Sequence, residues 1–476
     1  MQSGVLSIDI GTSSLKAALI TDDGTVLQFT RLFFPPQVSA ADWVRSLFSA
    51  WHTAANGFHV QAICISGNGP SLVAVHRQCS AVSKASGNGA VPPTAVCNDI
   101  IQEAEKDTLF LWNEKAGAHV QKPHIPAAAS LFLPRIAAFR TAYPHVFSRA
   151  HRLFSGPEYI LYLLTGKAVT VLPDPRYESA YWTVRELTFY AEKVLGIDTA
   201  ALARLLPPFV WAGTVQGQFC GIPVIAGVPD FIAALIGTGT LSAGAACDRA
   251  GSSEGINVCT ETQPRMGGTL LLPSVIPDLW NVSFVLPDSG TRFSSFLTEN
   301  GLSNQDYSIG MERIAAEPFV RTGAYPATFA GKGRSLVEDL AFQVRRGCDL
   351  VERASGMHPV YTLSGGQARN ELWCQMKADM TGRTFALPRF ADAELLGNAA
   401  LAFCALQPGQ SGAGSIQAGS GASNTGCLAA TVRQLLHIER YYEPCAAYAS
   451  RYTEKYLQIY PPHETGAAAA IGRPYG

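Results

Sequence analysis

The apolar positions near the start of the chain form short runs separated by polar turns. Two β-rich runs, Leu6–Ile10 and Leu15–Ile20, flank a turn of Gly, Thr and Ser, and this pattern predicts a hairpin. A third strand is expected over Gly24–Phe29, entered through the Asp22-Asp23-Gly24 turn. The chain is therefore expected to open with three consecutive strands.

A helix and a buried strand are expected next. Asp42 is the expected N-cap of a helix whose apolar positions 43, 47, 48 and 51 share one face. The run Val60–Ser66 predicts a buried strand that ends in the loop Gly67-Asn68-Gly69-Pro70. Three strands, a helix and a strand are the opening order of an actin-like or ribonuclease-H-like layer. A Rossmann domain would open with a βαβ unit instead.

The middle of the chain continues as a mixture of strands and helices. Ala95–Asp99 is expected to end a strand, and residues 130–166 are expected to be helical up to Gly166. A short buried strand that begins at Gly221 ends in a Gly/Pro turn, after which Asp230 begins a helix.

Toward the C-terminus the pattern predicts a long amphipathic helix over Ser335–Ser355. A strand over Pro359–Ser364 runs into a glycine pair, and a helix over Glu371–Met380 follows. Residues 409–426 are rich in Gly, Ser and Ala and are expected to form a flexible surface loop.

Composition narrows the class of protein. A chain of 476 residues is expected to form two or three domains, and 47% hydrophobic with 15% charged residues is typical of a well-packed enzyme. The net charge of −1 argues against a dedicated nucleic-acid-binding protein. The 11 cysteines include no C-x-x-C pair, and no apolar run is suited to span a membrane. We therefore expect a cytoplasmic protein without a nucleic-acid or membrane partner.

The opening hairpin is the first candidate for chemistry. Its small turn residues would let a phosphate approach backbone N–H groups closely, and Lys16 adds a positive charge. Asp9 would face the same space and could hold Mg²⁺ directly or through water, because Mg²⁺ prefers a carboxylate together with phosphate oxygens. An ordinary hairpin with a polar turn is the alternative.

Further candidates lie at the ends of later strands. Asp230 begins a helix, where a carboxylate is commonly an N-cap, but the loops 237–240 and 250–254 that follow are rich in Gly, Ser and Thr and are candidate phosphate cradles. Asn98 and Asp99 could hydrogen-bond a polyol, or cap a helix over Ile100–Lys106. The glycine pair at 365–366 would let a flat ligand such as adenine lie against the backbone.

The order of these motifs resembles the FGGY family of carbohydrate kinases, within the sugar kinase, Hsp70 and actin superfamily. The likeness extends from about residue 4 to about residue 455. It depends on several motifs together, which are Asp9–Ser14 with Lys16, Ile65–Gly67, Asn98-Asp99, Tyr159–Gly166, Gly227–Asp230, Gly237–Gly239, Gly251–Ser253, and Ser364–Gly366 through Trp373, Ala378-Asp379 and Gly382.

This resemblance implies an α/β fold of two actin-like domains with a cleft between them. Residues 1–220 would form a sugar-binding half and residues 221–476 a nucleotide-binding half. The implied activity is phosphorylation of a small sugar or polyol by ATP with Mg²⁺. A homodimer is an assembly that the sequence leaves open.

The resemblance also implies roles for individual residues. Asp230 would be the catalytic base and a ligand of the sugar, and Asp9 would hold Mg²⁺. The ATP-binding residues would be Gly11, Thr12, Ser13, Ser14, Lys16, Gly251, Ser252 and Ser253 at the phosphates and Gly365, Gly366 and Asn370 at adenosine. The sugar would also contact Asn68, Asn98 and Asp99.

The sugar-binding half departs from the family pattern. Xylulokinases carry a Gln-Met-His-Gly run where this chain has Asn68-Gly69-Pro70-Ser71, and Cys97 replaces a usual Trp. Ile101 replaces an Arg that often follows the Asp, and Pro229 precedes the expected base. A second hypothesis is therefore a sugar- and nucleotide-binding sensor of the same fold that has lost turnover. A chaperone-like ATPase of the superfamily is a third, although nothing here resembles an appended peptide-binding domain.

Overall fold

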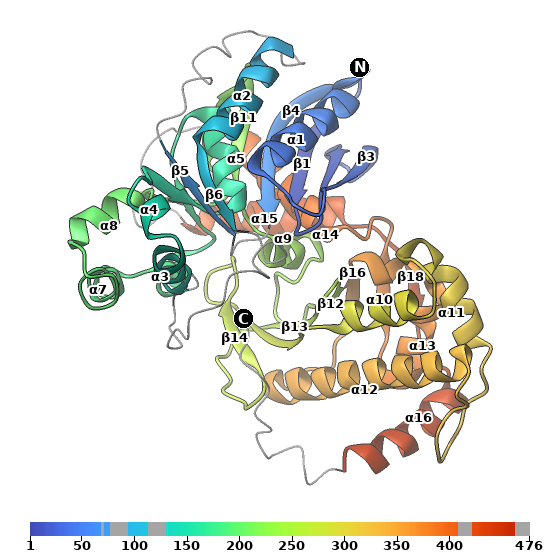
Figure 1. The fold of residues 1–476 in the computed structure, drawn as a ribbon. Coiled ribbons are helices and arrows are strands. Elements are labelled where there is room, and N and C mark those ends of the chain that lie inside the picture. The colour runs from blue at the N-terminus through green and yellow to red at the C-terminus, as the bar shows by residue number, and fades with distance from the viewer. Residues whose placement is uncertain (68–70, 77–93, 113–129, 131, 408–420, 462–476) are drawn as a thin grey trace. The chain divides into compact units, whose positions relative to one another are not determined.

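A computed structural model describes residues 1–67, 71–76, 94–112, 130, 132–407 and 421–461 of the chain. The chain divides into two compact units (Figure 1). Unit 1 comprises Met1–Ala233 and Glu394–Leu435, and unit 2 comprises Ala234–Ala393 and Leu436–Gly476. Each unit is built around one main sheet.

This division differs from the boundary expected after residue 220. Strand β11 (Ile222–Pro229) pairs in parallel with β4 (His59–Gly67), so the chain beyond residue 220 continues the first sheet. Helix α14 (Ala393–Leu406) also returns to this sheet, where Asn398 donates a hydrogen bond to the carbonyl of Ile8. Pairing and packing between distant segments therefore decide the boundary, and composition does not reveal them.

The main sheet of unit 1 has the strand order β10-β11-β4-β1-β2-β3. β1 is antiparallel to β2 and parallel to β4. Two small sheets have the orders β6-β5-β7 and β8-β9. The strands other than β4 and β11 are β1 (Ser3–Ile10), β2 (Ser14–Ile20), β3 (Val26–Phe33), β5 (Leu72–Val75), β6 (Thr108–Trp112), β7 (Arg152–Phe154), β8 (Thr170–Leu172), β9 (Phe209–Trp211) and β10 (Val215–Phe219).

The helices of unit 1 come from both of its chain segments. They are α1 (Ala40–Ala55), α2 (Thr94–Asp107), α3 (Leu133–Ala142), α4 (Pro144–Phe147), α5 (Gly156–Thr165), η3 (Pro175–Tyr177), α6 (Glu178–Tyr181), α7 (Val184–Phe189), η4 (Tyr190–Leu195), α8 (Thr199–Leu205), α14 and α15 (Gly421–Leu435). Helix α9 (Asp230–Gly237) contains the boundary between the units.

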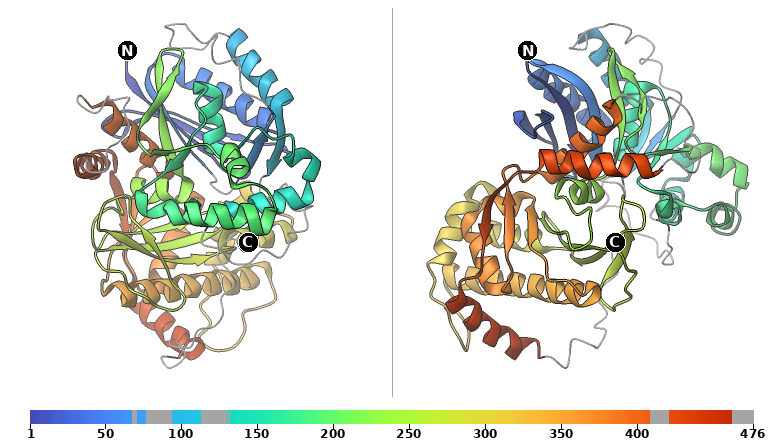
Figure 2. Two further views of the ribbon diagram at one scale, coloured as in Figure 1. Left: turned by 90° about the vertical axis from the view of Figure 1, so that its left-hand side faces the viewer. Right: turned by 180° about the vertical axis from the view of Figure 1, so that it is seen from behind.

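Alternate residues of the central strands face two different layers. Ile8 and Ile10 of β1 belong to the apolar core that α1 and α5 cover. Asp9 faces the other side, where Ser66 of β4 donates a hydrogen bond to its carboxylate. Asn398 of α14 in turn donates to Ser66. Figure 2 shows α14 and α15, in orange and orange-red, beside the strands of this sheet.

The predicted opening of the chain is confirmed, with one correction at a helix cap. β1, β2 and β3 form the expected strands and α1 the expected helix. The N-cap of α1 is Ser39 rather than Asp42. Asp42 lies at the third helical position and completes a capping box, because its side chain accepts from the Ser39 backbone N–H.

Two other expectations in unit 1 are wrong. Residues 95–99 do not end a strand but lie in the first turns of α2. Residues 130–166 are not helical throughout, because β7 separates α4 from α5 and pairs with β5. The predicted end at Gly166 is confirmed, since Gly166 caps α5 in the left-handed conformation with φ 71°.

Unit 2 contains a seven-stranded sheet of order β14-β15-β13-β12-β16-β17-β18. Its strands are β12 (Ala246–Ala250), β13 (Glu254–Thr260), β14 (Leu270–Pro273), β15 (Trp280–Leu286), β16 (Tyr361–Ser364), β17 (Phe385–Pro388) and β18 (Ile438–Tyr442). Its helices are α10 (Ser289–Glu299), η5 (Asn304–Asp306), α11 (Tyr307–Ala315), α12 (Phe329–Ser355), η6 (Gly366–Arg369), α13 (Glu371–Thr381) and α16 (Ala446–Ile459).

The long helix α12 organises the core of unit 2. It packs against β13 and β15 and against α13, and Figure 1 shows it extended along this unit. The expected helix over Ser335–Ser355 is thus confirmed but begins earlier, at Phe329 after the Thr328 N-cap. The expected strand before the glycine pair and the helix after it are β16 and α13. The expected loop at 409–426 lies largely outside the described residues, but its last part begins α15.

Two further findings bear on the class of protein. Within the described ranges, no helix is long and apolar enough to cross a membrane. Of the ten cysteines that the structure describes, all but Cys427 and Cys445 are buried, as expected for cysteines that act as small core residues.

Candidate active site

The opening hairpin places Asp9 opposite Lys16. The two residues are register partners in β1 and β2, and Lys16 Nζ lies 3.4 Å from Asp9 Oδ2. The turn between them is tight, because the Gly11 N–H donates to the Ser14 carbonyl at 3.0 Å. The Ser14 hydroxyl accepts a hydrogen bond from Arg31 Nε, also at 3.0 Å. The structure thus brings together the carboxylate, the cation and the small-residue turn that the sequence singled out.

Asp9 is a buried carboxylate in a polar setting. Its relative exposure is 3%, and Ser66 Oγ donates to its Oδ1 at 3.0 Å. Burial raises the pKa of Asp9 to about 6; Lys16 opposes this rise, and Glu394 and Asp230 add to it. The carboxylates of Glu394 and Asp230 therefore lie close enough to Asp9 to act on it electrostatically.

Two site residues come from α14 and were not predicted from the sequence. Glu394 Oε2 lies 3.4 Å from Lys16 Nζ, so Lys16 is shared between Glu394 and Asp9. Asn398, one helical turn further on, is fully buried and donates to Ser66 Oγ at 2.8 Å. The sequence signal was a Glu and an Asn four positions apart in an otherwise apolar helix, which places both on one face.

The pairing of β11 with β4 brings Asp230 to the same edge of the sheet as Asp9. Pro229 pairs with Gly67 at the end of β4, and Asp9 pairs with the neighbouring Ser66. A Cβ on Gly227 would lie 2.0 Å from the Ile65 carbonyl oxygen, so only glycine permits this approach. The half-buried Asp230 follows and begins α9.

A small hollow borders the strand that leads to Asp230. Its lining is mainly apolar and includes Gly227, Val228, Pro229, Ile65, Leu161 and Val171. Glu158 also lines it, but both of its carboxylate oxygens accept from backbone N–H groups, of Ser155 and Val171. Burial raises the pKa of Glu158. We therefore assign Glu158 a structural role at the start of α5.

The other expected sugar-binding residues are not placed together by the structure. Asn98 is exposed and Asp99 half-buried, and both lie within α2 rather than at a strand end. Asn68 lies outside the described residues. Their contact with a sugar therefore stays a prediction.

In unit 2 the loop Gly251–Ser253 joins β12 to β13, and hydrogen bonds to its carbonyl groups hold it in place. The Ser252 carbonyl accepts from the Thr291 N–H at 3.1 Å, and the Gly251 carbonyl accepts from Gln367 Nε2 at 3.4 Å. In a planar trans peptide the N–H points away from the carbonyl. The loop therefore turns the N–H groups of Ser252 and Ser253 away from these partners, an arrangement suited to binding an anion.

The glycine pair after β16 packs against the same loop. Gly365 has φ 92°, and a Cβ there would lie 2.3 Å from the Ala250 carbonyl oxygen. A Cβ on Gly366 would meet nothing within 4 Å, so its surroundings are open. Asn370 is the N-cap of α13, because its Oδ1 accepts from the Trp373 N–H at 2.9 Å. Binding of adenosine by these residues stays a prediction.

The loop after α9 does not have the features of a phosphate cradle. Thr238 is buried, and its hydroxyl donates to the Ala234 carbonyl at 2.8 Å and contacts the Thr240 hydroxyl at 2.9 Å. These hydroxyl groups therefore stabilise the end of α9.

The donor set around Asp9 fits a magnesium ion in chemistry. Carboxylate oxygens are the ligands that Mg²⁺ prefers, and it usually shares them with phosphate oxygens and water. Among the described residues, no group of three or more His, Cys, Asp or Glu side chains is arranged to hold a metal ion. Binding of Mg²⁺ by Asp9 together with the phosphate oxygens of a nucleotide stays a prediction.

Comparison with known proteins identifies the class to which this architecture corresponds. Residues 313–406 match the C-terminal domain of the FGGY family of carbohydrate kinases. The fold resembles a crystal structure of a xylulose kinase from Brucella ovis, with a TM-score of 0.69 at 17% identity over 96% of this chain and 98% of that one. It also resembles Plasmodium falciparum glycerol kinase with ADP, with a TM-score of 0.63 at 13% identity over 96% and 97% of the two chains.

A curated relative supports the same class at the sequence level. Xylulose kinase of Lactococcus lactis subsp. lactis (strain IL1403) is 22% identical over 426 residues, covering 79% of this chain and 82% of its own. The resemblance to FGGY carbohydrate kinases predicted from the sequence is thereby confirmed. The α/β fold of two actin-like domains is likewise confirmed as the fold of such kinases.

Proposed function

We propose that this protein transfers the γ-phosphoryl group of ATP to a hydroxyl group of a small sugar or polyol. The observation that carries the proposal is the position of Asp9 and Asp230 at one edge of the unit 1 sheet, where the charge of Asp230 adds to the raised pKa of Asp9. The similarity to sugar kinases in fold and in sequence supports it.

Asp230 is the proposed catalytic base. It would accept the proton of the sugar hydroxyl as that oxygen attacks the γ-phosphorus and ADP leaves. Its place at the first turn of α9, with Oδ1 2.6 Å from the Phe231 N–H, fixes the orientation of the carboxylate. A positioned base contributes about 10²–10⁴-fold to such a reaction.

The remaining expected site residues would bind and orient the nucleotide. Lys16 and the turn Gly11–Ser14 offer a cation and backbone N–H groups to the phosphates in unit 1, and Gly251–Ser253 offers N–H groups in unit 2. Mg²⁺ held at Asp9 would neutralise charge on the phosphate oxygens. Phosphoryl transfer depends chiefly on such positioning and charge stabilisation.

The test is an ADP-release assay of the purified protein with ATP across a panel of ketoses, polyols and sugar acids. We expect turnover with at least one member, and we expect Asp230→Asn to lower kcat by about 10²–10⁴-fold because the base is lost. Binding of ATP should change little, since Asp230 is assigned to the acceptor hydroxyl.

The matched control is Asp22→Asn, which makes the same substitution at an exposed turn and should retain parental turnover. Equal activity of Asp230→Asn and the parent would refute the assigned role. Binding of sugar and ATP by the parent without release of ADP, across the whole panel, would instead favour a sensor of the same fold.

A further inference from the structure

A lysine is buried beneath the loop Gly251–Ser253. The side chain of Lys377, in α13, is 1% exposed, and its Nζ lies 2.6 Å from Asp248 Oδ2 and 2.6 Å from Glu254 Oε1. Both carboxylates are fully buried. A buried ammonium is costly unless it is paired, and here it is paired twice.

The two carboxylates lie on opposite sides of the loop. Asp248 is in β12, just before the loop, and Glu254 is the first residue of β13, just after it. Ala250 and Glu254 are register partners where the two strands converge on the loop. A single ammonium group therefore ties together the two strands from which the loop projects.

Glu254 extends this connection to a second element. Its Oε2 accepts a hydrogen bond from Ser289 Oγ at 2.5 Å, and Ser289 is the first residue of α10. Two residues later, the Thr291 N–H donates to the Ser252 carbonyl of the loop. Gly290 lies so close that a Cβ on it would be 2.0 Å from the Gly251 carbonyl oxygen. The start of α10 is thus held both to the loop and to the carboxylate beneath it.

The charge of this cluster suits a site for an anion. Burial tends to raise the pKa of Glu254, but Lys377 and the hydrogen bond from Ser289 hold it below its ordinary range. Burial raises the pKa of Asp248 and so favours its protonated form. The three side chains are then neutral in sum, and they place no net negative charge under the loop.

We infer that Lys377, paired with Asp248 and Glu254, is a positioning residue that holds Gly251–Ser253 in the conformation that presents the N–H groups of Ser252 and Ser253 to nucleotide phosphate. This rests on the proposed function, because the loop is assigned to ATP. Lys377 does not touch the nucleotide; it acts through the strands and α10.

The experiment measures ADP binding to the full chain by titration calorimetry without sugar. Lys377→Met should weaken ADP binding at least tenfold. Because this variant leaves two carboxylates buried without their cation, the neutral variant D248N/E254Q/K377M is measured beside it. The neutral variant should also bind ADP at least tenfold more weakly, and amide hydrogen exchange over residues 250–255 should be faster than in the parent.

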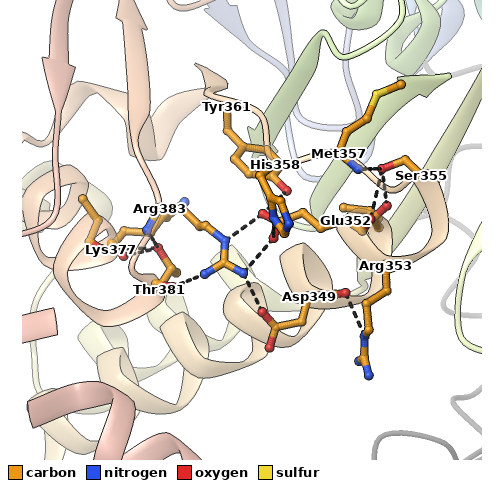
Figure 3. Close-up of polar contacts among 12 residues, drawn as sticks. Asp349, Glu352, Arg353, Ser355, Met357, His358, Tyr361, Lys377, Thr381 and Arg383 are labelled. Atoms are coloured by element: carbon orange, nitrogen blue, oxygen red, sulfur yellow. Dashed lines mark hydrogen bonds and ion pairs between the residues drawn. The ribbon is translucent and has the colours of Figure 1, made fainter. Parts of the chain in front are cut away.

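A second ion cluster in unit 2, which is partly buried, provides the control. Arg383 donates to Glu352 and Asp349 of α12 at 2.7–2.8 Å. Figure 3 shows these three residues and the contacts between them. This cluster contacts Tyr361, the first residue of β16, whereas Gly365 and the loop lie beyond the other end of that strand. Arg383→Met should therefore lower the unfolding temperature but leave ADP affinity within twofold of the parent.

The outcomes separate the two proposals. If the parent binds no ADP, the proposed function fails and the inference fails with it. If the parent binds ADP and the folded neutral variant binds it within twofold of the parent, the inference alone is overturned. Equal weakening by Arg383→Met and Lys377→Met would also overturn it, because the effect would then be general destabilisation.

Discussion

At the scale of single residues, the candidate site of unit 1 holds charge in a buried setting. Asp9 and Glu394 both lie 3.4 Å from Lys16 Nζ. Burial is the largest cause of the raised pKa of Asp9, and the charges of Glu394 and Asp230 add to it. Ionisable groups with shifted pKa values are common at functional sites, where the chemistry requires a group that does not stabilise the folded protein. The buried carboxylate of Asp9 should therefore lower the stability of the folded protein.

Asp9→Asn should stabilise the metal-free protein at neutral pH. In the unfolded chain Asp9 loses its proton near 3.8, whereas the folded protein keeps it until about pH 6. Between these two pH values the folded state therefore binds more protons than the unfolded state. The free energy of unfolding falls as pH rises through this range, and at pH 7 the carboxylate of Asp9 has lowered it by about 3 kcal/mol.

Urea unfolding in EDTA at pH 4, 5, 6 and 7 checks this prediction. The variant should be more stable than the parent at pH 7, with a difference that shrinks toward pH 4. Asp22→Asn, at an exposed turn, should follow the parent throughout. Parallel stability curves for Asp9→Asn and the parent would contradict the burial argument.

The sequence was informative about residues that stand in a local pattern. Asp9 and Lys16 were predictable because they flank one turn, and Asp230 because it begins a helix after a buried strand. Glu394 was not, because its partner Lys16 is 378 positions away in the chain. Asn98 and Asp99 were misplaced because a helix began where the pattern suggested a strand end.

At the scale of elements, the site depends on close approaches between backbones. Gly227 lets β11 lie against β4 just before Asp230, and Gly397 lets α14 lie against α9, where a Cβ would be 2.0 Å from the Ala233 carbonyl oxygen. Through these close approaches, β11 brings Asp230 and α14 brings Glu394 to the edge of the sheet.

Gly227→Ala should lower both stability and turnover. The added methyl group would overlap the Ile65 carbonyl, so β4 and β11 must separate and Asp230 must move with them. We expect a loss of more than about 2 kcal/mol in the free energy of unfolding and a fall in kcat of about tenfold or more, since misplacement by about 1 Å is costly. Urea unfolding and the ADP-release assay check this.

The control for Gly227→Ala is Gly267→Ala, at an exposed position where a Cβ would meet nothing within 4 Å. That variant should match the parent in both measurements. If Gly227→Ala were also neutral, the tight join of β4 and β11 would not be needed to place Asp230.

At the scale of the whole molecule, each unit has its own sheet and its own apolar core. In the part of the chain that the structure describes, no group of three or more His, Cys, Asp or Glu side chains is arranged to hold a metal ion. A metal ion is needed in our proposal only when a nucleotide is bound.

Removal of divalent cations should therefore separate activity from stability. EDTA should abolish ADP release, and added Mg²⁺ should restore it, because phosphoryl transfer needs the cation on the nucleotide. Without nucleotide, EDTA should change the unfolding temperature by less than about 1 °C, since our proposal assigns the metal ion to the nucleotide complex alone. A large shift in EDTA would reveal a structural metal site.

The sequence by itself determined many of the local elements and, through its resemblance to a known family, the class of the fold. Apolar periodicity, turn residues and caps act over a few residues, and they were sufficient for β1 to β4, α9, α12 and the strand–glycine–helix unit around Gly365. Only the tertiary structure decided which distant segments pair. The return of α14 to unit 1, and the burial of Lys377 between Asp248 and Glu254, depend on packing between residues more than a hundred positions apart, which no local pattern records.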